Sequence, residues 1–122
     1  MSTSINVTAC DNELYLIAFD SKSSYRVGQI QSGNHHTVDV TINLTEGTYV
    51  APAVLNGVNS NLSTTITTSI PTGQYSLCLV GLNWGTDVAF AATVNGKAFT
   101  GPVSPANTLG VVWTPALVTV KV

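Results

Sequence analysis

Hydrophobic and polar residues alternate most regularly between His36 and Leu44. From Val38 onward every second residue is aliphatic, and the residues between them are aspartate, threonine and asparagine. A period of two residues is typical of a β-strand with one buried face and one solvated face. The pattern therefore predicts a strand from His36 to Leu44, followed by a turn at Thr45–Gly47.

Shorter runs of the same kind, separated by turn residues, fill most of the remaining chain. In Tyr25–Gln31, strict alternation places Gln29 on the same face as Tyr25. Pro52 has no amide hydrogen to donate, so the strand around it is predicted to lie at a sheet edge or to contain a bulge. The other predicted strands are Ser4–Ala9, Glu13–Phe19, Thr48–Leu55, Leu62–Ile70 and Gln74–Trp84, and the chain ends in two strand pieces separated by Pro115, Val111–Thr114 and Ala116–Val122.

Two more strands are predicted on either side of Asn95 and Gly96. Both residues tolerate the positive φ that a type I′ turn requires, so the loop is a two-residue hairpin. This turn would pair Val94 with Lys97 and Ala92 with Phe99. No segment keeps a helical period for more than two turns, and the many threonines and valines disfavour helix. Roughly eight to ten short strands predict a single domain over residues 1–122, an antiparallel β-sandwich of jelly-roll or immunoglobulin-like type.

The stretch Ser69–Phe99 contains the longest predicted strand, and both faces of that strand are apolar over its centre. In Gln74–Trp84 one face carries Cys78, Val80 and Leu82, and the other carries leucines at the alternate positions. Glu13–Phe19 shows the same two-sided pattern. An antiparallel sheet without helices normally exposes one face to water, so we expect a second copy of the chain to cover this face. The alternative is that long neighbouring loops cover it.

Composition and charge exclude several classes of partner. Charged residues make up 8% of the chain, where about 25% is typical, and the formal net charge is −2. Only four residues are basic and no two are adjacent, which argues against binding to nucleic acid or to an anionic membrane surface. The first ten residues lack the basic and apolar regions of a signal peptide. We therefore expect synthesis in the cytoplasm, with release or surface exposure by a non-classical route as the alternative.

No constellation of residues indicates catalysis or a cofactor. His35, His36 and Asp39 have metal-ligating side chains, but in a strand the two histidines point to opposite faces, so a structural role is favoured over a metal site. The chain has no nucleophile elbow, phosphate-binding loop or EF-hand spacing. Cys10 and Cys78 are interpreted as buried free thiols rather than a disulfide. We therefore expect no enzyme activity, no metal and no cofactor.

The best candidate for a binding site is the turn that contains Asn83, Trp84, Thr86 and Asp87. Hydroxyl, amide and carboxylate groups beside an indole suit a neutral sugar, because the sugar's hydroxyls need polar partners and its C–H face needs an apolar plate. The alternative, which we favour, is that Trp84 closes one end of the core while Asn83 and Asp87 form the turn. The same two interpretations, a ligand-binding residue or a residue of the core, apply to Trp113.

In composition the chain resembles small soluble microbial lectins, although the acidic calcium loop of some of them is absent. The resemblance implies a non-catalytic, oligomeric carbohydrate-binding protein that gains avidity from several weak sites for a neutral glycan. The first alternative is a structural protein that assembles through its apolar face, such as a capsid, filament or inclusion component. The second is a protein-inhibitor or immunity-type binding partner.

Overall fold

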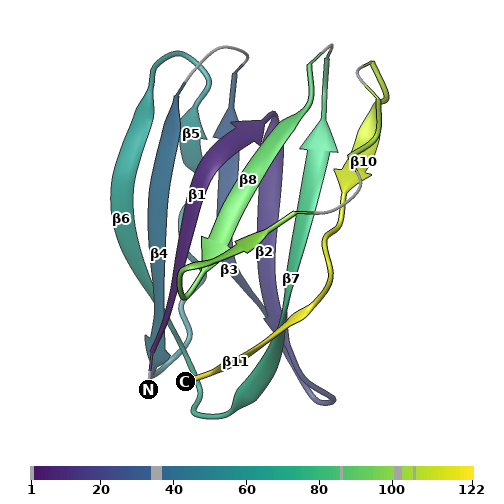
Figure 1. Ribbon diagram of the computed structural model, residues 1–122. Coiled ribbons are helices and arrows are strands. Elements are labelled where there is room, and N and C mark those ends of the chain that lie inside the picture. Colours follow the sequence, from purple (N-terminus) through teal and green to yellow (C-terminus); the bar gives the residue numbers. More distant parts are fainter. Residues whose placement is uncertain (1, 34–36, 86, 101–102, 106) are drawn as a thin grey trace.

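Two β-sheets packed face to face make up the molecule (Figure 1). The computed structural model describes residues 2–33, 37–85, 87–100, 103–105 and 107–122. These residues form eleven strands and no helix, so the predicted all-β sandwich is confirmed. None of them belongs to a helix with the length and apolarity needed to cross a membrane.

Each sheet combines strands that are far apart in the sequence. The first sheet has the order β6-β4-β1-β8-β9, with strands β6 (Leu62–Ile70), β4 (Val38–Glu46), β1 (Thr3–Asp11), β8 (Ala89–Val94) and β9 (Lys97–Phe99). The second has the order β10-β7-β2-β3-β5, with β11 also paired to β7; its strands are β10 (Gly110–Trp113), β7 (Gln74–Asn83), β2 (Glu13–Phe19), β3 (Ser24–Ser32), β5 (Leu55–Gly57) and β11 (Val118–Lys121).

The sheets are mixed, so the expectation of a purely antiparallel sandwich is wrong. Strand β6 pairs with β4 in parallel, and β5 pairs with β3 in parallel. A parallel pair needs a crossover connection, and here each crossover runs through the opposite sheet. The chain passes from β3 through β4 to β5, and from β4 through β5 to β6. Local alternation carries no information about such long-range pairing.

The segment before β5 was predicted to be a strand around Pro52, and it is not one. Residues 48–54 form no ladder, and only Leu55–Gly57 is extended and paired. Two side-chain contacts attach the segment to β3 instead. Arg26 donates from Nη2 to the carbonyl of Pro52 at 2.8 Å, and the Tyr49 hydroxyl donates to the carbonyl of Arg26 at 2.9 Å.

The hairpin at Asn95–Gly96 forms as predicted. Both residues have positive φ, 50° for Asn95 and 81° for Gly96, and Val94 pairs with Lys97. Asn95 also joins the hairpin to β1, because its backbone N–H donates to the carbonyl of Ser4 at 2.7 Å and its side-chain oxygen accepts from the Ser4 N–H at 2.9 Å.

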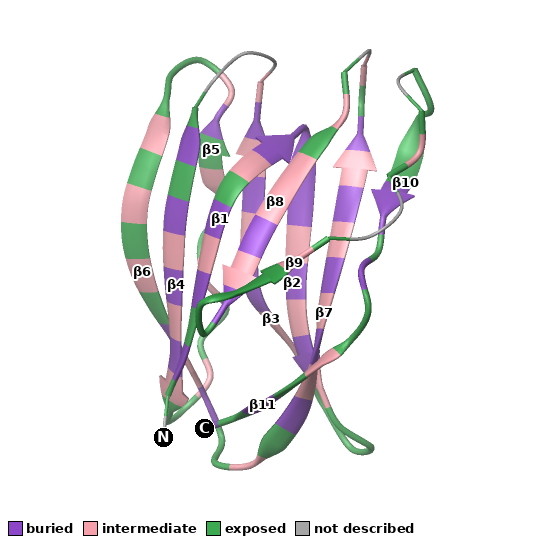
Figure 2. Ribbon diagram, viewed as in Figure 1, coloured by how far each residue is buried: buried purple, intermediate pink, exposed green. Residues whose placement is uncertain are grey.

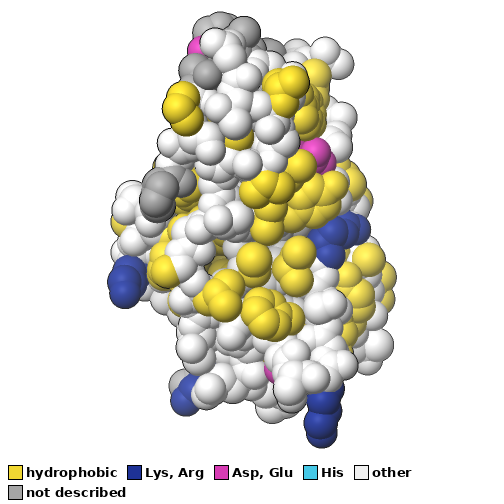
Figure 3. Space-filling view, turned by 90° about the vertical axis from the view of Figure 1, so that its right-hand side faces the viewer, with side chains coloured by type: hydrophobic (Ala, Val, Ile, Leu, Met, Phe, Trp, Pro, Cys, Tyr) yellow, Lys and Arg dark blue, Asp and Glu magenta, His cyan; other side chains and the backbone are white. Residues whose placement is uncertain are grey.

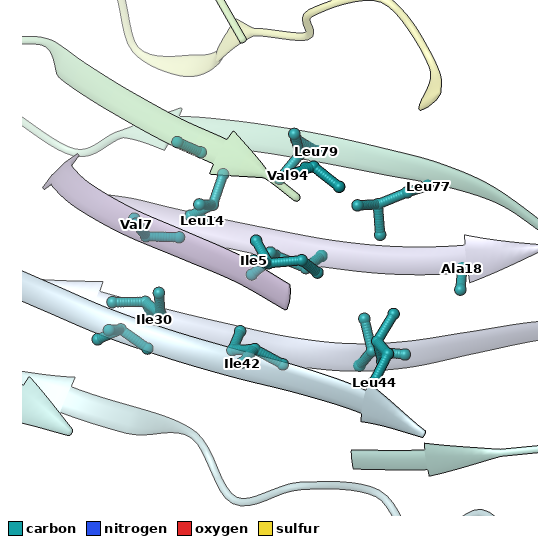
Figure 4. Close-up of a cluster of buried hydrophobic side chains, with 14 of the residues drawn as sticks. Ile5, Val7, Leu14, Ala18, Ile30, Ile42, Leu44, Leu77, Leu79 and Val94 are labelled. Atoms are coloured by element: carbon teal, nitrogen blue, oxygen red, sulfur yellow. The ribbon is translucent and has the colours of Figure 1, made fainter. Parts of the chain in front are cut away.

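The core lies between the sheets and consists of the inward-facing aliphatic residues of both (Figure 4). Figure 2 shows buried residues alternating with less buried ones along β4 and β7, as a two-residue period requires. The aliphatic side chains with no exposed surface are Ile5, Val7, Leu14, Leu16, Ala18, Val27, Ile30, Val40, Ile42, Leu44, Ile70 and Leu77.

A stack of aromatic rings fills the part of the core beside β10. Phe90 lies parallel to Trp113, with ring centroids 5.5 Å apart and an interplanar angle of 8°. Trp113 is 1% exposed. Gly81 leaves room for the stack, since a Cβ atom there would lie 2.8 Å from the Phe90 ring.

We expect Gly81→Ala to destabilise the protein by about 1–3 kcal/mol, the usual cost of overpacking a core. The Phe90 ring cannot move away easily because Trp113 lies against it. Gly85→Ala is the matched control, because a Cβ there meets nothing within 4 Å, and it should be nearly neutral. Urea unfolding of the two variants measures the difference, and equal midpoints would contradict the prediction.

Candidate functional site

The turn after β7 does not hold its predicted binding residues together. Asn83 is 2% exposed and faces inward. Its side-chain Nδ2 donates to the carbonyls of Gly85 at 2.9 Å and Thr108 at 2.6 Å, and its Oδ1 accepts from the Gly85 N–H at 3.2 Å. Asn83 therefore shapes the turn and attaches it to the loop before β10, as the turn-forming interpretation expected.

Asp87 lies on a different surface from Trp84. It lines a depression of about 360 Å³ together with Thr8 and Asp11 of β1 and with Thr37. This depression lies at the end of the β1–β8 pair where Asp11 is opposite Ala89. Thr86 lies outside the described residues. Of the described residues in the predicted set, only Trp84 lies on the outer face of the six-stranded sheet.

Trp84 stands on the outer face of the six-stranded sheet and is 45% exposed. The interpretation of Trp84 as a plug of the core end is therefore wrong, and Trp113 has that role instead. Two contacts from the β1–β2 corner hold Trp84 in position. Its backbone N–H donates to Oδ1 of Asn12 at 2.7 Å, and its indole Nε1–H donates to Oε1 of Glu13 at 3.4 Å.

Glu13 is the centre of a polar cluster on this outer face. Its Oε2 accepts hydrogen bonds from Nε2 of Gln29 at 2.7 Å and from Nε2 of Gln31 at 2.9 Å. Glu13 is only 7% exposed, and among the described residues no basic side chain forms an ion pair with it. Three neutral N–H donors thus satisfy a buried carboxylate, and we call Glu13, Gln29, Gln31 and Trp84 the Glu13 cluster.

A shift in the pairing of β2 with β3 brings the cluster together. Near the β2–β3 turn, Ile17 pairs with Arg26, but the next residue, Leu16, pairs with Gly28, so Val27 is extra. Because of this bulge, Gln29 and Gln31 share the outer face with Glu13, and Gln29 does not share the inner face with Tyr25 as strict alternation predicted. The Thr68 hydroxyl of β6 donates to the carbonyl of Val27 at 2.9 Å and supports the bulge from inside the sandwich.

Sequence reasoning therefore missed Glu13, Gln29 and Gln31. The alternation of β3 shows that the two glutamines share a face with each other. Nothing in the local pattern shows which face this is, because one inserted residue reverses the side of every residue beyond it.

The arrangement presents an apolar plate beside hydrogen-bonding groups. Each glutamine amide donates to Glu13 through nitrogen and has an oxygen that can accept from a ligand hydroxyl. The indole offers a flat surface of large area whose orientation is fixed by its N–H bond. Figure 3, which views the molecule from the edge formed by β7, β10 and β11, shows hydrophobic side chains gathered in a band, with few charged groups among them.

The other predicted candidates for reactive or metal-binding chemistry are His35, His36, Asp39 and the two cysteines. His35 and His36 lie outside the described residues, and Asp39 accepts a hydrogen bond from Nδ2 of Asn6 at 2.9 Å. No group of three or more metal-ligating side chains occurs in the described part of the chain. Cys10 and Cys78 are free thiols, as interpreted, but only Cys10 is buried, whereas Cys78 is partly exposed. Burial raises the pKa of both, and for Cys10 the carboxylates of Asp11 and Glu13 raise it further.

Comparisons of the chain with models of known protein families, with curated protein sequences and with solved structures gave no match.

We expect Glu13→Gln to destabilise the protein by about 1–2 kcal/mol, because one carboxylate oxygen becomes an NH₂ group that faces other N–H donors. The indole N–H signal of Trp84 in a ¹H–¹⁵N NMR spectrum should shift, while that of Trp113 should not. Glu46→Gln is the control, because Glu46 is exposed and, among the described residues, accepts only from the Thr72 hydroxyl. An unchanged Trp84 signal would show that Glu13 does not hold the indole.

Proposed function

We propose that the protein is a non-catalytic binding module for neutral carbohydrate, and that it binds through the Glu13 cluster, with the Trp84 indole as the apolar plate. The observation that carries the proposal is a half-exposed indole whose position is fixed by its own N–H and by the backbone. A plate held in place before binding loses little conformational entropy when a ligand contacts it. This geometry suits the C–H face of a sugar ring better than it suits structural packing.

The electrostatics of the cluster favour a neutral ligand over a charged one. Glu13 would repel an anionic sugar, and its buried oxygens already accept three N–H donors, which leaves a cationic group little access to them. The side-chain amides of Gln29 and Gln31 are the groups that remain to bind hydroxyls. The cluster contains one carboxylate, whereas hydrolysis of a glycosidic bond normally uses two. Binding without turnover is therefore the proposed activity.

We expect Trp84→Ala to weaken the binding of a neutral sugar by roughly fivefold to thirtyfold, because a stacked ring contributes on the order of 1–2 kcal/mol. Titration calorimetry against a panel of simple neutral sugars identifies the ligand, and the variant is then titrated with it. Leu117→Ala is the control, because Leu117 is 56% exposed and lies between β10 and β11, outside the cluster. The proposal fails if no sugar binds the wild type, or if Trp84→Ala binds equally well.

A second candidate, a self-assembling structural protein, is favoured by one observation. Half-buried apolar residues continue along the outer face away from Glu13, and Ile17, Phe19 and Cys78 line a shallow depression of about 450 Å³ there. Light scattering separates the two candidates, since open-ended particles that grow with concentration would indicate the structural role.

A further inference from the structure

Strand β6 forms one lateral edge of the five-stranded sheet along its whole length (Figure 1). Its nine residues, Leu62–Ile70, include no charged residue, no proline and no glycine. An edge of this kind presents a row of unpaired backbone groups to any strand that can approach it, and proteins usually block such edges. Here the usual means of blocking are missing.

The other edges of the sandwich do carry protection. Strands β5 and β9 have only three residues each, and Lys97 begins β9. In the six-stranded sheet, the edge far from β5 is formed by β10 and β11. The β10 ladder is interrupted by a register shift between Val111 and Trp113, and the four-residue β11 contains Lys121. Short length, charge and irregular pairing each oppose the addition of a further strand. The contrast makes β6 the edge that is open to pairing.

The backbone groups that point outward from β6 follow from its pairing with β4. The Leu62 N–H donates to the carbonyl of Thr37, and the Ile70 carbonyl accepts from the N–H of Gly47. Because successive residues direct their backbone groups to opposite sides, every second residue from Leu62 bonds to β4. The residues between them, Ser63, Thr65, Thr67 and Ser69, direct both N–H and C=O away from the sheet.

The sequence of β6 is nearly palindromic about its central residue, Ile66. Residues at equal distances from the centre are identical or, at the two ends, both aliphatic. The matching pairs are Leu62 with Ile70, Ser63 with Ser69, Thr64 with Thr68 and Thr65 with Thr67.

We propose that two copies of the chain associate through antiparallel pairing of β6 with β6, about a two-fold axis at Ile66. In this register each residue whose backbone groups point outward lies opposite another such residue, Ser63 opposite Ser69 and Thr65 opposite Thr67. Each outward N–H group therefore faces a carbonyl group of the other copy. Across the axis, like side chains pair, and Thr–Thr and Thr–Ser pairs are among the favourable cross-strand contacts. A two-fold axis closes the assembly at a dimer, because the same edge is used by both copies.

The side chains of β6 are compatible with a continuous ten-stranded sheet. Ser63, Thr65 and Thr67 are exposed on the outer face, where their uncharged side chains can lie opposite one another. On the inner face Ile66 would meet its own symmetry mate, which extends the apolar layer across the boundary. Asp39 of the neighbouring strand is directed to Asn6 on β1, away from this edge.

The pairing has a consequence for carbohydrate recognition that rests on the proposed function. Antiparallel strands of one sheet are related by an axis normal to the sheet, so each layer of the sandwich keeps its side. The two Glu13 clusters would therefore lie on the same side of the dimer, where they could engage one glycan-bearing surface and gain avidity. The association of β6 is tested without any sugar, so its failure and that of the binding proposal are distinguishable.

The first test is the mass of the full chain over a dilution series, measured by light scattering or sedimentation. We expect a species with twice the mass of one chain that dissociates on dilution. Thr65→Pro should raise the dissociation constant by at least roughly tenfold, because it removes two symmetry-related hydrogen bonds from the interface. The Thr65 N–H points away from β4, so proline is tolerated in the monomer. Thr65→Val keeps the backbone donor and is the control that should still dimerise.

The second test is oxidative cross-linking, which reads the register directly and does not depend on the proline variant folding. In a Cys78→Ser background, Ile66→Cys should form an intermolecular disulfide, because directly opposed residues of a non-hydrogen-bonded pair have Cα atoms about 4.5 Å apart. Thr65→Cys should not, because its own symmetry mate lies diagonally at about 7–8 Å.

Three results would overturn the proposal. They are a monomer at every concentration, a dimer that Thr65→Pro leaves intact, and a disulfide that forms through residue 65 in preference to residue 66. A monomer at every concentration would indicate that β6 pairs with a strand from a different protein. A dimer that survives Thr65→Pro would indicate that the interface lies elsewhere on the molecule.

Discussion

The extra residue at Val27 of β3 is the constraint on which the rest of the molecule depends. Tyr25, near the β2–β3 turn, and Ile30 are an odd number of residues apart, so in a regular strand they would face opposite sides. The extra residue lets both face the interior, where Tyr25 is partly buried and Ile30 is fully buried. The same insertion turns Gln29 and Gln31 outward to meet Glu13. The bulge is supported by Thr68 from the opposite sheet, so the position of the polar cluster depends on contact between the layers.

The outer face of the six-stranded sheet has a polar part around Glu13 and an apolar part beyond it. Around Glu13 a carboxylate, two amides and an indole form a fixed set of hydrogen bonds, and beyond it the face becomes apolar. Burial of Glu13 is tolerated because each of its oxygens has a neutral donor. A surface organised by such bonds can present a flat ring to a ligand without rearranging.

The low charge of the chain has its largest consequence at the sheet edges. With four basic and six acidic residues, few positions can carry a protecting charge. Lys97 and Lys121 lie in edge strands, and short lengths or register shifts protect β5 and β10. Strand β6 has no such protection, and its serines and threonines can pair with copies of themselves across a two-fold axis. The residue types that replace charge in the composition are the same ones that make this edge self-complementary.

The sequence by itself determined the features that depend on neighbouring residues. Alternation around Val40 and Ile42 identified the half-buried strand β4, and the asparagine and glycine of residues 95 and 96 identified the hairpin. Only the tertiary structure decided which tryptophan is buried, which strands run parallel, and which face carries the glutamines. The physical reason is the same in each case. A strand's period fixes which residues share a face, but the face that becomes buried depends on pairing with distant strands, and a single bulge reverses it.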